Sequence, residues 1–416
     1  MVLFSSLQYS FFGSVLTIGG IVGAASCGKI ADLVGRRGAI WVSNALYIGG
    51  LVAIALSKSA WSLDLGRLLM GVGIGILAYV VPVYIAEITP KNFRGAFVSL
   101  IMVHVTNAEY ELSMTGCGIS VTYVIGSVCD WRILALLGTI PCLIQLLGAF
   151  FISESPRWLA KVGREKELEV ALKLLRGKNA DVSHEAAEIT EYTEHLDQLA
   201  EDGIKELFQQ KYACVVIVGV GLMALLQFGG LNGYAYYMNS TLESAGISSG
   251  VGSVAASVVR IIMNICGLFL VDKSGRRPLF LVSSIGVCLG SFITGLSFLL
   301  QGFHLGKEIT PSLALAGILL DHKLLNKQLS KSHAGFLCLI FPVNIKDRAG
   351  SLVNLVSSVG SWIVAYTFNF LFEWSSAGVF FIYAIIAGLG VVFIAKLVPE
   401  TKGRTLEEIQ ASILTQ

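Results

Sequence analysis

The sequence predicts an all-α membrane protein made of two pseudo-repeated helical halves, and three observations lead to this prediction. First, 54% of the 416 residues are hydrophobic and 14% are charged, whereas soluble domains carry about 25% charged residues. Second, the apolar residues occur in runs of about 20, the length of a helix that crosses a bilayer. Third, one short charged motif occurs once in each half of the chain. Together these observations exclude a soluble domain.

The apolar runs define the predicted membrane spans. They cover residues 12–31, 39–57, 63–86, 112–128, 133–152, 213–237, 251–271, 278–300, 349–372 and 376–398, and a weaker run lies between 311 and 341. The predicted organisation follows from them: an N-terminal transmembrane half at 1–154 with about five spans, cytoplasmic amphipathic helices at 155–211, a C-terminal transmembrane half at 212–398 and a cytoplasmic tail at 399–416.

The positions of Lys and Arg predict which loops are cytoplasmic. These residues gather at 29–37, 91–94, 157–178, 273–277, 346–348 and 402–404, whereas the loops between them carry few. Basic loops of membrane proteins stay on the cytoplasmic side. The segment after the fifth span begins with Ser155 and Pro156, which is typical of a helix N-cap followed by proline in the first turn. We therefore expect its helices to lie beneath the cytoplasmic face.

The duplicated motif reads Asp32-Leu-Val-Gly-Arg36-Arg37 in the first half and Asp272-Lys-Ser-Gly-Arg276-Arg277 in the second half. Duplication of this kind is typical of transporters built from two repeated halves. The positive-inside rule by itself explains the arginines. It does not explain the acidic residues beside them, because acids contribute little to topology. The motif therefore favours paired charges at the cytoplasmic ends of helices.

Other classes of site are not indicated by the sequence. The eight cysteines form no CxxC pair, and the six histidines show no metal-ligand spacing. No set of nucleophile, base and orienting residue appears. We therefore expect no enzyme activity, no metal, no cofactor and no nucleic-acid partner. The expected partners are a small molecule and the lipid bilayer, and the oligomeric state is not predicted.

Four further motifs complete an ordered set. They are Pro82-Val-Tyr-Ile-Ala-Glu87 with Arg94-Gly95 after it, Ser153-Glu154-Ser155-Pro156-Arg157, Gln227-Phe-Gly-Gly230-Leu-Asn232, and Pro399-Glu400-Thr401-Lys402-Gly403-Arg404. With the duplicated motif, this set resembles the sugar porter family of the major facilitator superfamily. The residues of these motifs are most similar to those of the plant ERD6-like branch. The resemblance covers most of the chain. It implies a two-halved helical bundle that carries a monosaccharide by alternating access, in a vacuolar or plasma membrane.

The resemblance also implies which residues act. A cytoplasmic gating network would comprise Asp32, Arg36, Arg37, Glu87, Arg94, Glu154, Asp272, Arg276, Arg277 and Glu400. Sugar would be bound by Gln227, Asn232, Tyr236 and Tyr237, although ordinary polar residues of a water-lined groove would look the same. Arg67 lies inside an apolar run and needs a partner, because a buried charge in lipid is costly. Asn239 begins an Asn-Ser-Thr glycosylation sequon.

Several positions depart from the family pattern. The chain begins at what resembles the family's second helix, Leu226 and Ser358 stand where the family has glutamine and tryptophan, and residues 101–111 look foreign. Residues 321–333 carry one Asp and three Lys, each of which costs roughly 2.5–3.5 kcal/mol at the centre of a bilayer. We expect a degraded tenth helix that lies on the membrane surface. Leu339 replaces an acid, so the second-half network should be weaker.

These departures leave alternatives open. The resemblance to the ERD6-like branch favours facilitated diffusion, but symporters of the family place a first-helix acid near the arginine that corresponds to Arg67, so protons stay a candidate partner. A degenerate product that enters the membrane without transporting sugar is the alternative to a transporter, and the departures favour it for this chain. A non-transporting membrane sensor is the third hypothesis.

Overall fold

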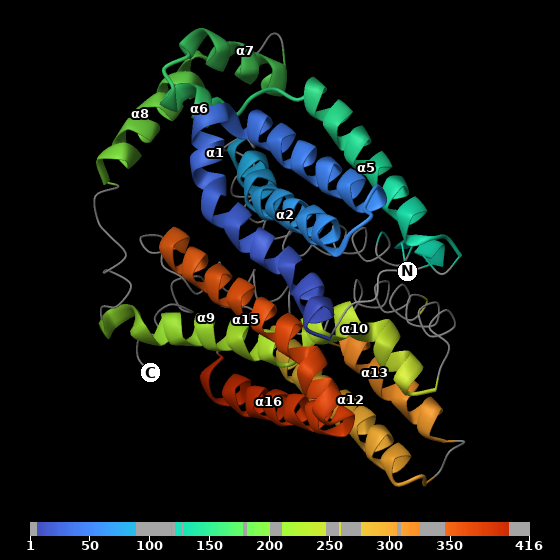
Figure 1. The fold of residues 1–416 in the computed structure, drawn as a ribbon. Helices are drawn as coiled ribbons and strands as arrows, with labels where there is room; N and C mark the ends of the chain where they lie inside the picture. Colours follow the sequence, from blue (N-terminus) through green and yellow to red (C-terminus); the bar gives the residue numbers. More distant parts are fainter. Residues whose placement is uncertain are drawn as a thin grey trace. The chain divides into compact units, whose positions relative to one another are not determined.

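The computed structural model describes residues 6–88, 118, 121–122, 124–126, 128–177, 181–199, 210–246, 258, 276–305, 309–324 and 346–398. The regular structure of these residues is helical throughout (Figure 1). They fall into two compact units. Unit 1 contains the described residues of Val15–Ala96 and Trp131–Glu206, and unit 2 contains those of Ser5–Ser14, Phe97–Asp130 and Leu207–Gln416. The four-part organisation expected from the sequence stays a prediction.

Unit 1 is built on three long apolar helices: α1 (Ser6–Ala55) from Val15 onward, α2 (Ala60–Ile88) and α5 (Trp131–Phe151). The backbone of α1 leaves helical geometry at Gly35, where φ is 81° and ψ is 172°. Only glycine adopts this region without strain, because it has no Cβ. The helix therefore turns at Gly35, and its two arms correspond to the predicted spans 12–31 and 39–57.

The two arms of α1 pack on opposite faces of α2. A Cβ on Gly19 of the first arm would lie 3.0 Å from the Cα of Gly71. On the second arm, the hydroxyl of Ser43 donates a hydrogen bond of 2.6 Å to the carbonyl of Gly73. Small residues at both contacts let the helix backbones approach closely, which is how helices associate in lipid.

Three short helices continue unit 1 beyond the apolar region: α6 (Pro156–Lys161), α7 (Glu165–Arg176) and α8 (Ser183–Leu199). The predicted N-cap is confirmed, because Ser155 accepts a hydrogen bond of 3.4 Å from the backbone N–H of Trp158. At the start of α8, the hydroxyl and backbone N–H of Ser183 donate to Asp181 and lower the pKa of that carboxyl. These helices share a small apolar core made of Trp158, Leu159, Leu168, Ala171, Leu172, Val182 and Ile189.

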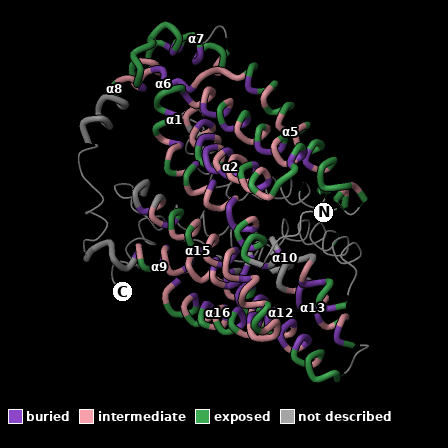
Figure 2. Tube along the Cα trace, in the orientation of Figure 1, coloured by how far each residue is buried: buried purple, intermediate pink, exposed green. Residues whose placement is uncertain are grey.

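Unit 2 contains α9 (Gln210–Phe228), α10 (Leu231–Ser244), α12 (Arg276–Gly302), α13 (Thr310–Leu324), α15 (Lys346–Trp374) and α16 (Ser376–Leu397). Buried residues recur along these helices (Figure 2). The predicted span 213–237 is not one continuous helix, because the helix breaks between α9 and α10; that the segment crosses the membrane stays a prediction. At this break Gly230 has a φ of 92°, and a Cβ there would lie 2.5 Å from Cδ2 of the Tyr383 ring.

Most of the other predicted spans are found. Helices α2, α5, α12, α15 and α16 match 63–86, 133–152, 278–300, 349–372 and 376–398. Six helices of the described residues, α1 among them, are long and apolar enough to cross a membrane. Spans 112–128 and 251–271 lie mostly outside the described residues. The weaker run begins as α13, which continues through Asp321 to Leu324; the remainder of 321–333, and residues 101–111, are outside the description.

Candidate functional site

The centre of the candidate site is an ion pair between Arg36, directly after the turn in α1, and Glu87, in the last turn of α2. Two parallel hydrogen bonds of 2.9 Å join them, from Nε to Oε2 and from Nη2 to Oε1. The two side chains are only 14% and 10% exposed. A bidentate pair of this kind is charge-assisted and fixes the relative orientation of both groups. It ties the turn of α1 to the end of α2.

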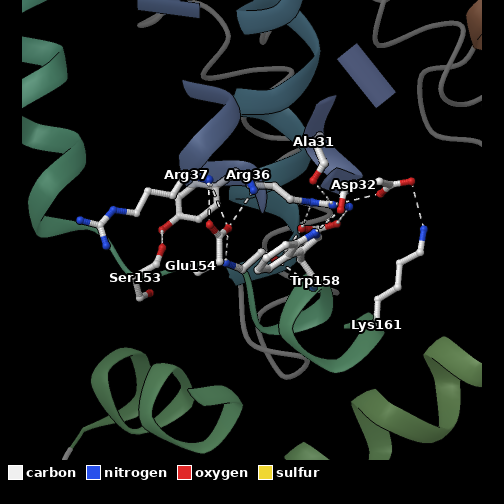
Figure 3. A network of polar contacts seen from close by, with 11 residues as sticks. Ala31, Asp32, Arg36, Arg37, Ser153, Glu154, Trp158 and Lys161 are labelled. Carbon is white, nitrogen blue, oxygen red and sulfur yellow. Dashed lines mark hydrogen bonds and ion pairs between the residues drawn. The ribbon is translucent and has the colours of Figure 1, made fainter. Parts of the chain in front are cut away.

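Asp32 connects this ion pair to α6 (Figure 3). One of its carboxylate oxygens lies 3.3 Å from Nη1 of Arg36, and the other lies 3.1 Å from Nζ of Lys161. Its backbone carbonyl accepts a hydrogen bond of 2.9 Å from the indole N–H of Trp158. The Asp32 side chain is 49% exposed, so these ion pairs are screened and individually weak. The indole bond is the firmer of the two connections to α6.

Glu154 caps the second arm of α1 from a distant part of the chain. Its Oε1 accepts from the backbone N–H groups of Arg36 at 2.8 Å and Arg37 at 3.1 Å, and also from that of Ser155 at 2.9 Å. The first N–H groups of a helix have no partner inside the helix, and a carboxylate at this end also interacts favourably with the helix dipole. Glu154 therefore stabilises the turn that Gly35 makes.

The second arginine of each repeat holds the end of the last long apolar helix of its own unit. Arg37 donates from Nε to the carbonyl of Ala149 and from Nη2 to that of Phe150, both at 2.9 Å, near the end of α5. Arg277 donates from Nη2 to the carbonyl of Ala395, near the end of α16, at 2.5 Å. Cations at a helix C-terminus satisfy carbonyls that lack an intrahelical partner. The sequence repeat is thus a structural repeat as well.

The rest of the predicted second-half network is outside the description. Asp272, Glu400 and Leu339 are not among the described residues, and neither is Arg94 of the first half. Arg276 begins α12, but its side chain is not described. The structure thus brings together Asp32, Arg36, Arg37, Glu87 and Glu154, and it places Arg277 in the corresponding position of unit 2. The expected weakness of the second-half network stays a prediction.

Two of the predicted sugar-binding residues pack against α15 within unit 2. Gln227, near the end of α9, is buried and donates from Nε2 to the hydroxyl of Ser357 at 2.7 Å. Tyr237 is also buried; its hydroxyl donates to the carbonyl of Ala365 at 3.1 Å, and its ring stacks on Phe368 with centroids 5.1 Å apart. Asn232 and Tyr236 lie in α10, and their side chains are not described. Their role in binding stays a prediction.

A comparison with known proteins identifies the family of this chain. The family model described as "Sugar (and other) transporter" matches residues 4–412. The chain belongs to the sugar transporter family. Two relatives from Arabidopsis thaliana are the putative sugar transporter ERD6-like 13, 49% identical over 409 residues, and the sugar transporter ERD6-like 15, 50% identical over 410 residues. Each match covers 98% of this chain, and the matches cover 82% and 84% of the two relatives.

Solved structures agree with this assignment at the level of the fold. A partially occluded inward-open structure of the xylose transporter XylE from E. coli is similar with a TM-score of 0.72 and 24% identity, over 97% of this chain and 90% of that chain. The major facilitator superfamily proton:xylose symporter XylE bound to 6-bromo-6-deoxy-D-glucose has a TM-score of 0.69 and 24% identity, over 98% and 89%. The predicted major facilitator fold and ERD6-like resemblance are confirmed. This family member is a multi-pass membrane protein and not an enzyme.

One position where the chain departs from the sugar porter pattern has a clear structural setting. Leu226 is 3% exposed and belongs to an apolar cluster with Val215, Val218, Leu222, Phe280, Val287, Ala349, Val353, Ala387, Ile394 and Val398. Its side chain is therefore part of the core of unit 2. It packs among apolar groups, whereas the neighbouring Gln227 bonds to a polar partner.

The structure gives Arg67 an acidic neighbour and places the sequon of Asn239 in a helix. The sequence showed no partner for Arg67, but Asp64, one turn earlier in α2, interacts with it electrostatically. The sequon at Asn239 lies inside α10, where Thr241 is buried and donates its hydroxyl to the carbonyl of Tyr237 at 2.9 Å. A glycan acceptor normally lies in an accessible loop, so this setting disfavours modification of the folded protein.

Three residues of this family member were not predicted as parts of the site. Ser155 donates from its hydroxyl to Oε2 of Glu87 at 2.5 Å. Arg176 forms a bidentate pair with Glu185 and donates to the carbonyl of Ile88, the last residue of α2. Asp64 is the third, and its spacing of three residues from Arg67 is a readable helical pair. The contacts of Ser155 with Glu87 and of Arg176 with Ile88 join residues distant in sequence, and they give no such signal. Within the described stretches, no cluster of His, Cys, Asp or Glu could hold a metal ion.

Proposed function

We propose that this chain carries a monosaccharide across a membrane by alternating access, as a facilitator without proton coupling. The observation that carries the proposal is the buried bidentate pair of Arg36 and Glu87 with the Glu154 cap beside it. Such a cluster acts as a lock when its formation favours one of two conformations. Membership of the sugar transporter family supports the sugar as the transported molecule.

The proposed lock works through the strength and the geometry of its contacts. In the closed state, Asp32 and Arg36 at the turn of α1 join Glu87 at the end of α2 and Lys161 at the end of α6. Removing one partner of a buried ion pair costs about 3–5 kcal/mol, because the other charge is left without compensation. An energy of this size is enough to move a two-state equilibrium from one conformation to the other. Opening therefore requires both charges to regain water or new partners together.

The proposed sugar site comprises Gln227, Asn232, Tyr236 and Tyr237. A sugar hydroxyl both donates and accepts hydrogen bonds, and an amide offers both functions on one side chain. Each such contact contributes about 1 kcal/mol net. The bond from Gln227 to Ser357 holds the amide at α15, where both its donor and its acceptor functions suit a sugar hydroxyl. The relatives named as sugar transporters support a sugar ligand of this kind.

The first test is uptake of radiolabelled glucose by hexose-transport-null yeast that expresses the whole chain, with membrane insertion checked in the same cells. We expect saturable uptake that Arg36→Ala and Glu87→Ala reduce strongly. The exposed pair of Lys173 and Glu169, 3.9 Å apart on α7, provides the control, and Glu169→Ala should transport normally. Inserted protein without uptake would contradict the proposal and favour the degenerate product or the sensor. Sugar-dependent thermal stabilisation of the purified protein separates these two.

The second test addresses coupling and location. Uptake measured from pH 5 to 8, with and without an uncoupler, should equilibrate the sugar without concentrating it. Accumulation above the external concentration that collapses with the uncoupler would show a symporter, with the Asp64–Arg67 pair as the first place to look for the proton site. A fluorescent fusion expressed in plant cells distinguishes between the two expected locations, the vacuolar membrane and the plasma membrane.

A further inference from the structure

We infer that Ser155 is a positioning residue that couples the proposed lock to the docking of α6. One hydroxyl makes two bonds at once: it donates to Oε2 of Glu87 at 2.5 Å and accepts from the backbone N–H of Trp158 at 3.4 Å. The first bond belongs to the lock, and the second is the N-cap of α6. This inference rests on the proposed function only in so far as Arg36 and Glu87 act as a lock.

The surroundings of Ser155 leave its hydroxyl little freedom. The residue is fully buried, and its backbone N–H donates to Glu154 at 2.9 Å. The following Pro156 has a fixed φ and no N–H. The backbone N–H of Trp158 is one of the first N–H groups of α6, so it has no acceptor within that helix. The hydroxyl of Ser155 is thus the group that satisfies Trp158, and it is oriented by Glu87.

The geometry makes the two bonds depend on each other. When the hydroxyl hydrogen points at Glu87, the oxygen lone pairs point at Trp158, so one rotamer satisfies both. If Glu87 moves away as the lock opens, the hydroxyl loses the acceptor that orients it. The first turn of α6 is then capped less firmly. Trp158 also donates from its indole to the carbonyl of Asp32 at 2.9 Å, so the loosening reaches the motif on α1 as well.

Hydrogen–deuterium exchange on the purified full chain without sugar tests this coupling, with peptides that cover 84–88 and 155–161. We expect Ser155→Ala to accelerate exchange of the Trp158 amide about fivefold, the effect of a lost N-cap, and also to accelerate exchange at 84–88. The decisive variant is Glu87→Ala, which should accelerate exchange at 155–161 although it leaves Ser155 in place. Ser155→Thr keeps the hydroxyl and should restore the wild-type rate in both peptides.

Two further variants separate the bonds. Ser155→Asp keeps an acceptor for Trp158 but cannot donate to Glu87 and places a negative charge beside it, so exchange should rise at 84–88 and stay near wild type at Trp158. Ser153→Ala removes a neighbouring buried hydroxyl that has no hydrogen-bond partner in the described part of the chain, and exchange should not change. If Ser153→Ala matched Ser155→Ala, the effect would come from any lost hydroxyl and the inference would be wrong.

The outcome that overturns the inference is independence of the two sites. If Glu87→Ala accelerated exchange only at 84–88 and Ser155→Ala only at 155–161, the hydroxyl would make two unrelated bonds. Should Ser155→Ala fail to fold, the Glu87→Ala comparison decides alone. Since no sugar is present, a chain that proved unable to transport would refute the proposed function and leave this result intact.

Discussion

The carboxylate of Glu154 occupies the space that a β-carbon on Gly35 would need. A Cβ built on Gly35 would lie 2.7 Å from the carboxyl carbon of Glu154, and the backbone of Gly35 has a φ of 81°. The same carboxylate accepts hydrogen bonds from the backbone of Arg36 and Arg37. Glycine at position 35 therefore allows both the turn in α1 and the approach of the acid that caps its second arm.

Replacement of Gly35 by alanine should destabilise the protein and displace Glu154. A residue with a Cβ in this backbone region costs about 1–3 kcal/mol, and the collision with the carboxylate adds to that cost. The measurement is the thermal midpoint in detergent. Gly28→Ala is the matched control, because Gly28 lies in the same helix and a Cβ there would meet nothing within 4 Å. Equal midpoints for the two variants would contradict the assignment.

The pair of Arg36 and Glu87 should show strong non-additivity in a double-mutant cycle. Arg36→Ala or Glu87→Ala each leaves a buried charge without its partner, at a cost of about 3–5 kcal/mol. The double variant removes both charges, so its free energy of unfolding should fall by less than the sum. Arg36→Lys should also be destabilising, because an ammonium group cannot form the two parallel bonds. Additive values would show that the two charges do not interact.

Arg176 should hold α8 and the end of α2 through one guanidinium group. It bonds to both oxygens of Glu185 at 2.8 and 3.1 Å and to the carbonyl of Ile88 at 3.0 Å. We expect Arg176→Ala to accelerate hydrogen exchange in α8 and to lower the unfolding free energy by about 1–3 kcal/mol. Glu167→Ala breaks an exposed pair with Arg164 and should change the unfolding free energy by less than about 1 kcal/mol. If hydrogen exchange in α8 of the Arg176→Ala variant matched that of the wild type, Arg176 would not have this role.

Ser357 should influence sugar affinity through Gln227. Ser357→Ala removes the 2.7 Å bond that orients the Gln227 amide, so it should raise the KM for the sugar about fivefold, the equivalent of one net hydrogen bond. The maximal rate should change less, because the lock in unit 1 is untouched. Ser358→Ala, at the next position of α15, is the control. If Ser357→Ala left the KM unchanged, or gave the same KM as Ser358→Ala, Gln227 would not take part in sugar binding.

Local patterns in the sequence were sufficient for the helices of the apolar runs. Hydropathy over 133–152 and 376–398 predicted α5 and α16, and the Ser155-Pro156 pair predicted where α6 begins. Runs of apolar residues and cap residues act within one or two turns, so these features could be read directly. Hydropathy over 213–237 did not reveal the break between α9 and α10, because that break depends on backbone geometry at Gly230, which takes a positive φ against Tyr383.

The sequence by itself determined the class of protein, the repeated motif and the family, because composition, spacing and motif order are properties of the chain alone. Only the tertiary structure decided which partner each charge has. Glu154 caps a helix that begins more than a hundred positions earlier, Ser155 reaches Glu87, and Leu226 points into the core while Gln227 meets Ser357. The physical reason is that hydrogen bonds and ion pairs depend on distance and direction in space, and no local pattern encodes the direction in which a side chain points after helices from distant segments pack together.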